Sequence, residues 1–477
     1  MKLPEAFLQS LEGVAGFERE AFVAVHERRE GVTSVRVNPA KYHVSGMQLS
    51  AANSETIASS LQPTIADWRL LPVPWSQYGF YLEQRPSFTF DPLFHAGCYY
   101  VQEASSMFLE QAFRQLTDLS QPLKVLDLCA SPGGKSTHIQ SLLSADSLLV
   151  SNEVIKPRSL VLMDNSIKWG CSNVVVTNND PKAFQKLAGV FDVLVVDAPC
   201  SGSGLFRKDE EAISEWSLYN VELCSQRQQR ILADALPSLK EGGLLVYCTC
   251  SYSAKEDEDI MDWLVEEMGV ENVGLNKDTF NGIVVSQSPR THSTGYRFYP
   301  DKINGEGFFL ACFRKTSGEA GARLRVSKPD NVSAKDRKIL EQWVRSDGME
   351  FLRFRENNIA LPSTLTGDFC ALQPLLNIQY AGVKVGQVLK ERLVPDHALA
   401  QSGVLAKSLP FSELTYEDAI RYLQRQELSI QPETPGWQVV RYQNHPLGWI
   451  NALQNRVNNY YPKEIRILKQ NNTPFKK

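Results

Sequence analysis

The strongest constraint on the fold is an alternation of short apolar segments with segments of helical character, from residue 91 to about 316. One apolar segment, 191–199 (FDVLVVDAP), is hydrophobic almost throughout, which is expected of a strand buried on both faces. Strands that alternate with helices predict an α/β fold with a mostly parallel sheet, whose ligands bind at the carboxyl ends of the strands. The expected strands are 124–128, 148–154, 174–177, 191–199 and 242–250.

Helices are expected between these strands, and a hairpin after the last one. A glycine-rich turn leads into a helix around 135–143, a second helix begins at Pro157, and a long helix covers about 219–239. The final hairpin is expected to pair 296–300 with 307–313. This pattern assigns residues 91–316 to a single domain.

The chain of 477 residues is too long for one hydrophobic core, so several domains are expected. Residues 1–90 begin with one or two helices and continue as a small α+β region. A basic stretch that contains Gly and Ser follows the central domain at 314–338 and predicts a linker. Residues 317–393 hold this linker and a first C-terminal domain of mixed helix and strand, and 394–477 form a last domain that is rich in strand. The β-prone segments of the N-terminal region are 33–37, 78–82 and 88–90.

Composition excludes several classes of protein. The net charge of −4 and a pI near 6.1 argue against a protein that binds nucleic acid by charge alone. No apolar run reaches the roughly 20 residues that span a bilayer, and the N-terminus does not resemble a secretion signal. The nine cysteines are irregularly spaced and the seven histidines are scattered. We therefore expect a reducing cytoplasm, no disulfide framework and no metal site.

The turn after the first expected strand reads Asp127-Leu-Cys-Ala-Ser-Pro-Gly-Gly-Lys-Ser136. Glycines let the backbone approach a cofactor closely, and the N-terminus of the next helix offers free N–H groups. The G-x-G-x-x-G pattern of a dinucleotide site is absent. Gly134, Lys135 and Ser136 match the end of a P-loop, but Cys129 occupies the position of its first glycine. An NTPase, and a turn that binds nothing, stay open as lesser alternatives.

Two further acids follow the next strands. Glu153 lies at the tip of the second strand, 26 residues after Asp127, where a carboxylate can accept both hydroxyls of a ribose. Asp180 ends the third strand in the corresponding way, and it could accept the exocyclic amine of adenine or simply cap a turn. One carboxylate at a strand end is often a solvated surface residue, but three at successive strand ends indicate a ligand that contains a nucleoside.

Two cysteines follow the last two parallel strands. Cys200 lies in the segment Asp197-Ala-Pro-Cys-Ser-Gly-Ser-Gly204, and Cys250 ends the strand 242–250. Because adjacent parallel strands end at one edge of a sheet, both thiols can meet in one cleft. Buried cysteines are usually inert, and Cys248 shares a strand face with Cys250 without lying at the tip. Cys250 is the preferred nucleophile, and Cys200 stays open as an alternative.

A reactive thiol at such a site suits methylation of carbon 5 of a cytosine. That carbon is a poor nucleophile until a thiolate adds to carbon 6 and makes it enamine-like. It can then attack a sulfonium methyl group, after which loss of the carbon 5 proton expels the thiolate. A free thiol has a pKa of about 8.5, which the site should lower. An acid such as Asp197 near ring N3 would stabilise the developing charge. Methylation of an exocyclic amine needs no thiol.

These motifs resemble the Nol1/Nop2/Sun family of RNA cytosine-C5 methyltransferases. The similar segments are DLCASPGGKS, NEVIKPR, DAPCSGSGLFRKD and CTCS, with RVNP and YYVQEASSM upstream and GEGFFLACFRK downstream, so the resemblance covers about 36–315. The C-terminal segments HPLGWI and NNYYPKEIRIL resemble the branch of bacterial ribosomal RNA small subunit methyltransferase F, whose last domain is PUA-like. This sequence departs from the family at Ser131, usually alanine, and at Glu210, usually proline.

The resemblance implies a Rossmann-like methyltransferase domain between RNA-binding regions, with S-adenosyl-L-methionine as cofactor. It assigns attack on the base to Cys250 and product release to Cys200. It implies a cytosine in the decoding region of 16S ribosomal RNA as the target, within the small ribosomal subunit, and we expect a monomeric cytoplasmic enzyme. The implied cofactor contacts are Cys129, Ala130, Ser131, Pro132, Gly133, Gly134, Lys135, Glu153, Asp180 and Asp197.

Local basic patches are expected to meet the RNA. Arg207 and Lys208 would contact phosphates, with Lys156 and Arg158 nearby in sequence, and the basic stretch 314–338 could be an RNA-facing strap instead of only a linker. In the last domain, aromatic side chains could stack on bases, or they could belong to its core. An RNA-binding assembly factor with an idle methyltransferase domain is a further alternative, which the intact acids and cysteines oppose. The aromatic and basic residues are Trp437, Tyr442, Trp449, Tyr460, Tyr461, Arg456, Lys463, Arg466, Lys469, Lys476 and Lys477.

Overall fold

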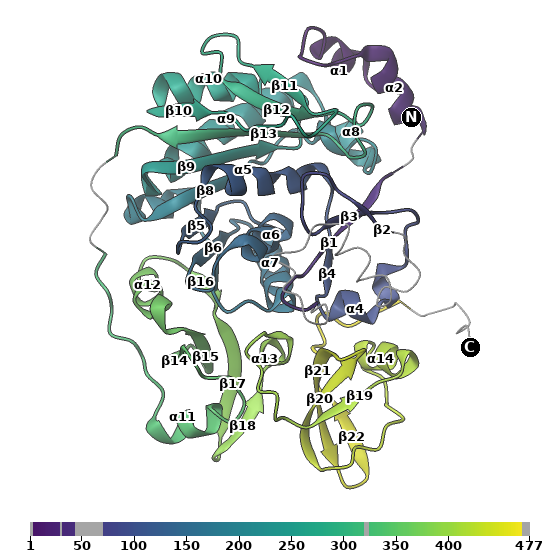
Figure 1. The fold of residues 1–477 in the computed structure, drawn as a ribbon, viewed down its shortest axis with the longest axis vertical. Helices are drawn as coiled ribbons and strands as arrows, with labels where there is room; N and C mark the ends of the chain where they lie inside the picture. The colour runs from purple at the N-terminus through teal and green to yellow at the C-terminus, as the bar shows by residue number, and fades with distance from the viewer. Residues whose placement is uncertain (1–2, 29–30, 43–69, 319–323, 470–477) are drawn as a thin grey trace.

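The structure is a computed structural model, and it describes residues 3–28, 31–42, 70–318 and 324–469. Its centre is a ten-stranded mixed sheet (Figure 1). Five strands run parallel in the order β7-β6-β5-β8-β9, and they confirm the five predicted strands to within three residues at each end. They are β5 (Lys124–Asp127), β6 (Leu148–Asn152), β7 (Val174–Thr177), β8 (Phe191–Asp197) and β9 (Leu239–Thr249).

Antiparallel strands extend this parallel set on both sides. On one side, β13 (Phe308–Lys315) pairs with β9 and also with β12 (Thr294–Phe298), which confirms the predicted hairpin. On the other side, β16 (Ile378–Ala381) comes from the C-terminal half of the chain and pairs with β7. The predicted Rossmann-like sheet is therefore confirmed, with antiparallel strands at both of its margins. The outer strands are β10 (Val270–Val273) and β11 (Val284–Gln287).

Helices cover both faces of the sheet, because successive side chains of each strand point to opposite faces. Leu126 of β5 and Val150 of β6 belong to one core, with α9 and α10, while Val125 and Leu149 belong to another, with α5, α6 and α7. None of the helices in the described ranges is long and apolar enough to cross a membrane. The helices are α5 (Leu109–Leu116), α6 (Gly134–Leu142), α7 (Lys156–Trp169), α9 (Leu218–Ala235) and α10 (Glu258–Glu267).

The N-terminal region holds the two expected helices and a small sheet in the order β2-β3-β1-β4. The predicted strand at 88–90 is wrong, because Phe88–Phe90 forms a 3-10 turn. Asp91 caps the short helix that follows by accepting the N–H of Leu93, and Pro92 fits the first helical position. The elements are α1 (Glu5–Ser10), α2 (Arg19–Arg28), β1 (Thr33–Val37), β2 (Leu70–Pro72), β3 (Gly79–Leu82), α4 (Pro92–His95) and β4 (Tyr99–Val101).

The C-terminal half forms two further four-stranded sheets, β14-β15-β17-β18 and β19-β20-β21-β22. The second sheet shares a core with the N-terminal sheet, in which Val35 and Phe80 join Val440 and Ile450. The N-terminal sheet and the last sheet of the chain therefore pack together beside the central domain (Figure 1). The elements are α11 (Ala334–Leu340), β14 (Met349–Phe354), β15 (Asn357–Pro362), α12 (Thr366–Leu372), β17 (Val383–Leu389), β18 (Arg392–Pro395), α13 (His397–Gln401), β19 (Phe411–Glu413), α14 (Tyr416–Leu423), β20 (Gly436–Tyr442), β21 (His445–Leu453) and β22 (Arg456–Asn459).

Candidate active site

Four turns meet at the carboxyl edge of the parallel strands. They follow β5, β6, β8 and β9, and they carry the glycine-rich motif, Glu153, Cys200 and Cys250. Since β5 pairs with both β6 and β8, and β8 pairs with β9, the four turns are neighbours in space. Ligands bind at this edge in open α/β sheets, which makes it the candidate active site.

The turn after β5 is shaped by glycine and tied to α7. Gly133 has a φ of +114°, which side-chain-bearing residues rarely adopt. The carbonyl of Pro132 accepts a hydrogen bond from Asn165 Nδ2 at 2.8 Å, and Ser131 both donates to and accepts from Arg158. The helix α6 begins directly after this turn, so its first N–H groups are free for a ligand. The turn is therefore a preformed backbone cradle.

Asp127, the last residue of β5, is fully buried beneath this cradle. Its Oδ2 accepts a hydrogen bond from Ser136 Oγ at 2.6 Å, while its Oδ1 has no hydrogen-bond partner among the described residues. Burial raises the pKa of Asp127 to about 7, the bond from Ser136 opposes this, and the charge of Asp197 adds to it. Ionisation of Asp127 therefore lowers the stability of the folded protein.

We expect Asp127→Asn to change how stability depends on pH. Because the pKa of folded Asp127 is about 7, against an ordinary value of 3.8, the folded protein binds this proton more tightly than the unfolded chain. The stability that this provides is present below pH 4 and is lost as the pH rises to 7. Asparagine does not ionise, so the variant does not lose this stability. Between pH 4 and pH 7, the difference in unfolding free energy between variant and wild type should shift in favour of the variant by on the order of 4 kcal/mol. Urea unfolding at several pH values measures the difference, and a constant difference would contradict the prediction.

The two acids predicted from the sequence lie at this edge in different ways. Glu153 is buried at the tip of β6, with Oε1 accepting the N–H of Ile155 at 2.9 Å and Oε2 3.4 Å from Arg158 Nη2. Asp180 lies three residues beyond the end of β7 and caps the 3-10 turn Pro181–Leu187 by accepting the N–H of Lys182. The cap uses only Oδ1 of Asp180, so Oδ2 is left for a ligand.

These groups fit S-adenosylmethionine. The ligand carries a positive sulfonium, and the edge holds the carboxylates of Glu153, Asp180 and Asp197. Its adenine ring needs hydrogen-bond partners, and the buried Nδ2 of Asn179, beside Asp180, has none among the described residues. The methionine end and the ribose of the ligand would meet the backbone cradle around Gly133. In the described ranges of the chain, no group of three or more His, Cys, Asp or Glu residues is arranged to hold a metal ion.

An ion pair joins the cradle to the end of β8. Lys135 Nζ lies 2.7 Å from Asp197 Oδ2 and 5.2 Å from the centre of the Phe308 ring. Burial has the largest single effect and lowers the pKa of Lys135, but the surrounding groups, led by Asp197, together outweigh burial and the pKa is raised. The lysine of the Gly-Lys-Ser segment is therefore charged and engaged by Asp197, an arrangement unlike the P-loop alternative.

The two cysteines predicted to share a cleft are in contact. Cys200 Sγ lies 2.8 Å from Cys250 Sγ, and both side chains are partly exposed, whereas Cys248 is buried. The hydrogen bond with Cys250 is the largest cause that raises the pKa of Cys200, followed by burial, by the charge of Cys250 and then by the negative charge of Glu256. Cys200 is therefore favoured as a protonated thiol in this pair.

Close backbone packing brings the cysteine loops together. Gly204 N donates to the carbonyl of Cys250 at 2.7 Å. A Cβ atom at Gly204 would lie 2.6 Å from both the Cys250 and the Gly307 carbonyl oxygens. Glycine is therefore required at Gly204, because any side chain would push the loop after Cys200 away from the turn after β9.

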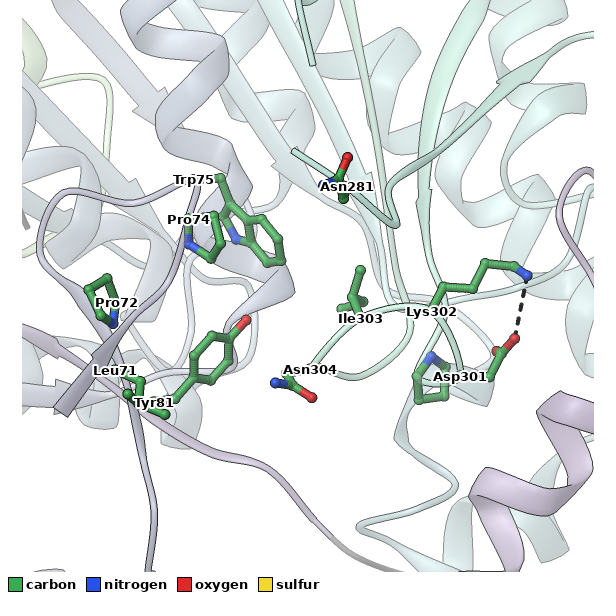
Figure 2. A pocket seen from close by; sticks show the side chains of 11 residues that line it. Leu71, Pro72, Pro74, Trp75, Tyr81, Asn281, Asp301, Lys302, Ile303 and Asn304 are labelled. Carbon is green, nitrogen blue, oxygen red and sulfur yellow. Dashed lines mark ion pairs between the residues drawn. The ribbon is translucent and has the colours of Figure 1, made fainter. Parts of the chain in front are cut away.

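A hollow of about 510 Å³ lies at the margin of this site (Figure 2). One wall comes from β2, β3 and the loop between them, with Trp75 and Tyr81, and the other from the loop after β12, including Asn304. The same loop continues to Glu306 and Gly307, which contact the loop after Cys200. The N-terminal region and the catalytic domain thus form this margin jointly.

The structure corrects one expectation for the RNA contacts. Arg207 is not available to phosphates, because its side chain is 4% exposed, donates to the carbonyl of Gly305 at 3.2 Å and lies 3.4 Å from Glu306. Lys208 is more exposed and lies 3.7 Å from the same carboxylate. Arg207 therefore fixes the loop after Cys200, while Lys208, Lys156 and Arg158 are accessible cations in this region.

Most aromatic residues of the last domain belong to its core. Trp449 and Tyr461 are buried, and Trp437 and Tyr442 pack against hydrophobic clusters. Tyr460 is 43% exposed, with its ring 4.4 Å from that of Trp437. The other four aromatic residues therefore belong to the core of the domain, as the second alternative from the sequence expected. Of the five, Tyr460 has the accessible ring. Lys476 and Lys477 lie outside the described residues.

Sequence reasoning missed Glu256, a buried carboxylate that contacts both cysteine loops. It lies in the acidic run 256–259, which looks like the solvated start of a helix. Its spacing of six residues from Cys250 was the available signal, but the spacing alone does not reveal burial.

Three family models match successive regions of the chain. They are the N-terminal domain of 16S rRNA methyltransferase RsmF over residues 3–104, 16S rRNA methyltransferase RsmB/F over 115–314, and the methyltransferase RsmF PUA domain over 411–467. The models therefore cover the N-terminal region, the central domain and the last sheet.

Relatives and solved structures agree with these models. Ribosomal RNA small subunit methyltransferase F of Aeromonas salmonicida is 31% identical, and that of Aeromonas hydrophila 30% identical, each over 97% of both chains. A methyltransferase homolog protein from Pyrococcus horikoshii is 26% identical with a TM-score of 0.51, covering 66% of this chain and all of that one. NSun6 from the same organism, solved with SFG, is 20% identical with a TM-score of 0.52, covers 66% of this chain and 98% of that one, and shares the fold.

The sheet and its carboxyl edge define a Rossmann-like methyltransferase. The chain belongs to the ribosomal RNA small subunit methyltransferase F family. It is accordingly an enzyme that methylates 16S ribosomal RNA with S-adenosylmethionine as the methyl donor.

Proposed function

We propose that this enzyme methylates carbon 5 of one cytosine in the decoding region of 16S ribosomal RNA, through a covalent bond between Cys250 and carbon 6. The observation that carries the proposal is the contact of two thiols, 2.8 Å apart, at the sheet edge that also holds the cofactor cradle. A methyltransferase acting on an amine or a hydroxyl group has no use for such a pair.

Cys250 acts first, as the nucleophile. Its thiolate adds to carbon 6, forming a carbon–sulfur bond and leaving carbon 5 electron-rich. S-Adenosylmethionine, when bound, would supply the electrophilic methyl group that carbon 5 takes up, and would leave as S-adenosylhomocysteine. A base then removes the proton from carbon 5, the carbon 5–carbon 6 double bond re-forms, and the Cys250 thiolate leaves with its electron pair. The ring is aromatic again and Cys250 is ready for another turnover.

Cys200 and Asp197 support this sequence. The Cys200 thiol donates to Cys250, which stabilises the thiolate before attack and again at elimination. Asp197 and Lys135 form an ion pair at the end of β8 beside the cysteines, where the pair would hold ring N3 and the Lys135 ammonium would balance the negative charge that develops there. A target base in a paired region must leave the stack to reach these groups.

The cofactor residues follow from the cradle and the acids. Cys129, Ala130, Ser131, Pro132, Gly133, Gly134 and Lys135 would enclose the methionine end and the ribose through backbone groups. Glu153 would accept the ribose hydroxyls, and Asp180 the adenine amine. Asp197 would serve the cofactor and the base together.

The remaining regions of the chain would hold the RNA. We assign this role to residues 1–90, 317–393 and 394–477, around the catalytic domain 91–316, with Lys208, Arg158 and Tyr460 as accessible contacts. The enzyme would act in the cytoplasm as a monomer, on rRNA within the small ribosomal subunit.

The test maps 5-methylcytosine in 16S rRNA. Cells with and without this gene are compared by bisulfite sequencing and mass spectrometry of rRNA fragments, and purified enzyme is then added to rRNA or subunits from the deletion strain. We expect one decoding-region cytosine to lose the mark in the deletion strain and regain it in vitro. A mark at another atom, or at a site outside the decoding region, would refute the corresponding element of the proposal.

A further inference from the structure

Glu256 lies between the two cysteine loops and is fully buried. Its Oε1 accepts the backbone N–H of Ser201 at 2.8 Å, and its Oε2 accepts the hydroxyl groups of Ser201 at 2.5 Å and Ser251 at 2.6 Å. Ser201 directly follows Cys200, and Ser251 directly follows Cys250. One carboxylate therefore fixes the chain immediately after each cysteine.

Side chains from β9 and α9 fix the position of Glu256. The hydroxyl of Tyr247, on β9, donates to the Glu256 carbonyl at 2.6 Å, and Gln228 Nε2, on α9, lies 3.3 Å from the carboxylate. The same Gln228 amide lies 3.2 Å from the carbonyl of Pro199, just before Cys200. The strand, the helix and both cysteine loops thus converge on this carboxylate.

The negative charge of Glu256 lowers the stability of the folded protein. It makes no ion pair in the described ranges of the chain, and burial raises its pKa while the hydrogen bonds from Ser201, Ser251 and Gln228 lower it. Neutral groups of similar shape would avoid this desolvation cost. Among the described residues, this buried carboxylate without an ion pair lies next to two reactive groups, which points to a use in the reaction.

We infer that Glu256 is a positioning residue for methyl transfer: it holds the sulfur atoms of Cys200 and Cys250 in contact and keeps the shared proton on Cys200. The inference rests on the proposed function. The hydrogen bonds to the two serines set the geometry, because the sulfur atoms are one residue away from the groups that are held. The negative charge keeps the proton on Cys200, because the carboxylate accepts the backbone N–H of Ser201, the residue after Cys200, and opposes ionisation of that thiol.

The test compares Glu256→Gln with the matched control Asp262→Asn. Asp262, on α10, is an equally buried carboxylate that accepts the N–H of Thr291 at 2.8 Å and its hydroxyl at 2.7 Å, and it contacts neither cysteine loop. We expect Glu256→Gln to lower kcat by about 10- to 100-fold, the scale of a small misplacement of reacting groups, with KM for RNA and for S-adenosylmethionine within about twofold. Asp262→Asn should keep kcat while losing comparable thermal stability.

A second measurement does not depend on activity. Alkylation of the wild-type protein with iodoacetamide, followed by peptide mass spectrometry, should label Cys250 faster than Cys200, because only the thiolate reacts. In Glu256→Gln the ratio of the two rates should fall about fivefold or more, whereas Asp262→Asn should keep the wild-type ratio. Glu256→Asp, which retains the charge, should keep more of the ratio than Glu256→Gln.

The outcomes separate this inference from the proposed function. If wild-type enzyme forms no 5-methylcytosine, the proposed function fails whatever the alkylation ratios are. If wild type is active and Glu256→Gln matches the control in both kcat and alkylation ratio, Glu256 is only a structural residue and the inference is overturned. A loss of kcat that follows the unfolded fraction, with an unchanged alkylation ratio, overturns it equally.

Discussion

Replacing Cys250 with alanine is expected to abolish methylation, whereas replacing Cys200 with serine is expected to trap the enzyme covalently on its RNA. Cys250→Ala removes the atom that would bond to carbon 6, so kcat should fall by on the order of 10⁴-fold or more, as for loss of other enzyme nucleophiles. Cys200→Ser keeps attack by Cys250 but replaces the thiol that lies 2.8 Å from its sulfur. Elimination should then be slower than attack, and the adduct should accumulate.

Denaturing gel electrophoresis with radiolabelled RNA measures both effects. Wild type should show little adduct, Cys200→Ser a strong shifted band, and the double variant none, because the trapped bond requires Cys250. Cys171→Ser is the matched control: Cys171 is also partly exposed, but it precedes β7 at the opposite edge of the sheet. Accumulation in Cys250→Ser instead of Cys200→Ser would reverse the two roles.

The strands of the central sheet could be predicted because burial on both faces leaves a clear apolar run at each of them. The error at 88–90 has a local cause: Phe and Thr favour strands, but the N-cap at Asp91 and the following Pro92 impose a helix start. The pairing of β16 (Ile378–Ala381) with β7 has no local signal, because an edge pairing across about 200 residues depends on how the C-terminal half packs.

The candidate site, like the fold, has some features that the sequence predicts and others that it does not. The meeting of Cys200 and Cys250 could be predicted, because both follow neighbouring parallel strands at the same edge. The burial of Arg207 and Glu256 could not, since both lie in charged segments that look solvated. Arg207 is buried by Glu306 and Glu256 by Ser201, and each partner comes from a distant loop. The sequence pattern thus predicts the reactive groups at strand ends. The buried charged residues that orient them can be identified only from tertiary contacts.

Asp197→Asn should lower kcat by about 10²- to 10³-fold, the scale of losing one preorganised group that stabilises transition-state charge. Asp197 Oδ2 is held 2.7 Å from Lys135 Nζ, so the ion pair as a whole needs little reorganisation when negative charge develops on the base. Lys135→Met should also reduce kcat, because it frees Asp197 from its fixed position. Since both residues act through one ion pair, the double variant should lose less than the product of the two single losses.

The matched control for Asp197 lies on the same strand. Asp192, near the start of β8, also pairs with a lysine, with Asp192 Oδ1 2.6 Å from Lys240 Nζ, but at the edge opposite the cysteines. Asp192→Asn should leave kcat within about twofold of wild type, because a partly exposed ion pair contributes at most about 1 kcal/mol to stability. Single-turnover methylation of RNA at saturating S-adenosylmethionine measures all four variants. If Asp197→Asn retained as much activity as Asp192→Asn, the Lys135–Asp197 pair would be a structural brace, and the charge at ring N3 would have to be stabilised by another group.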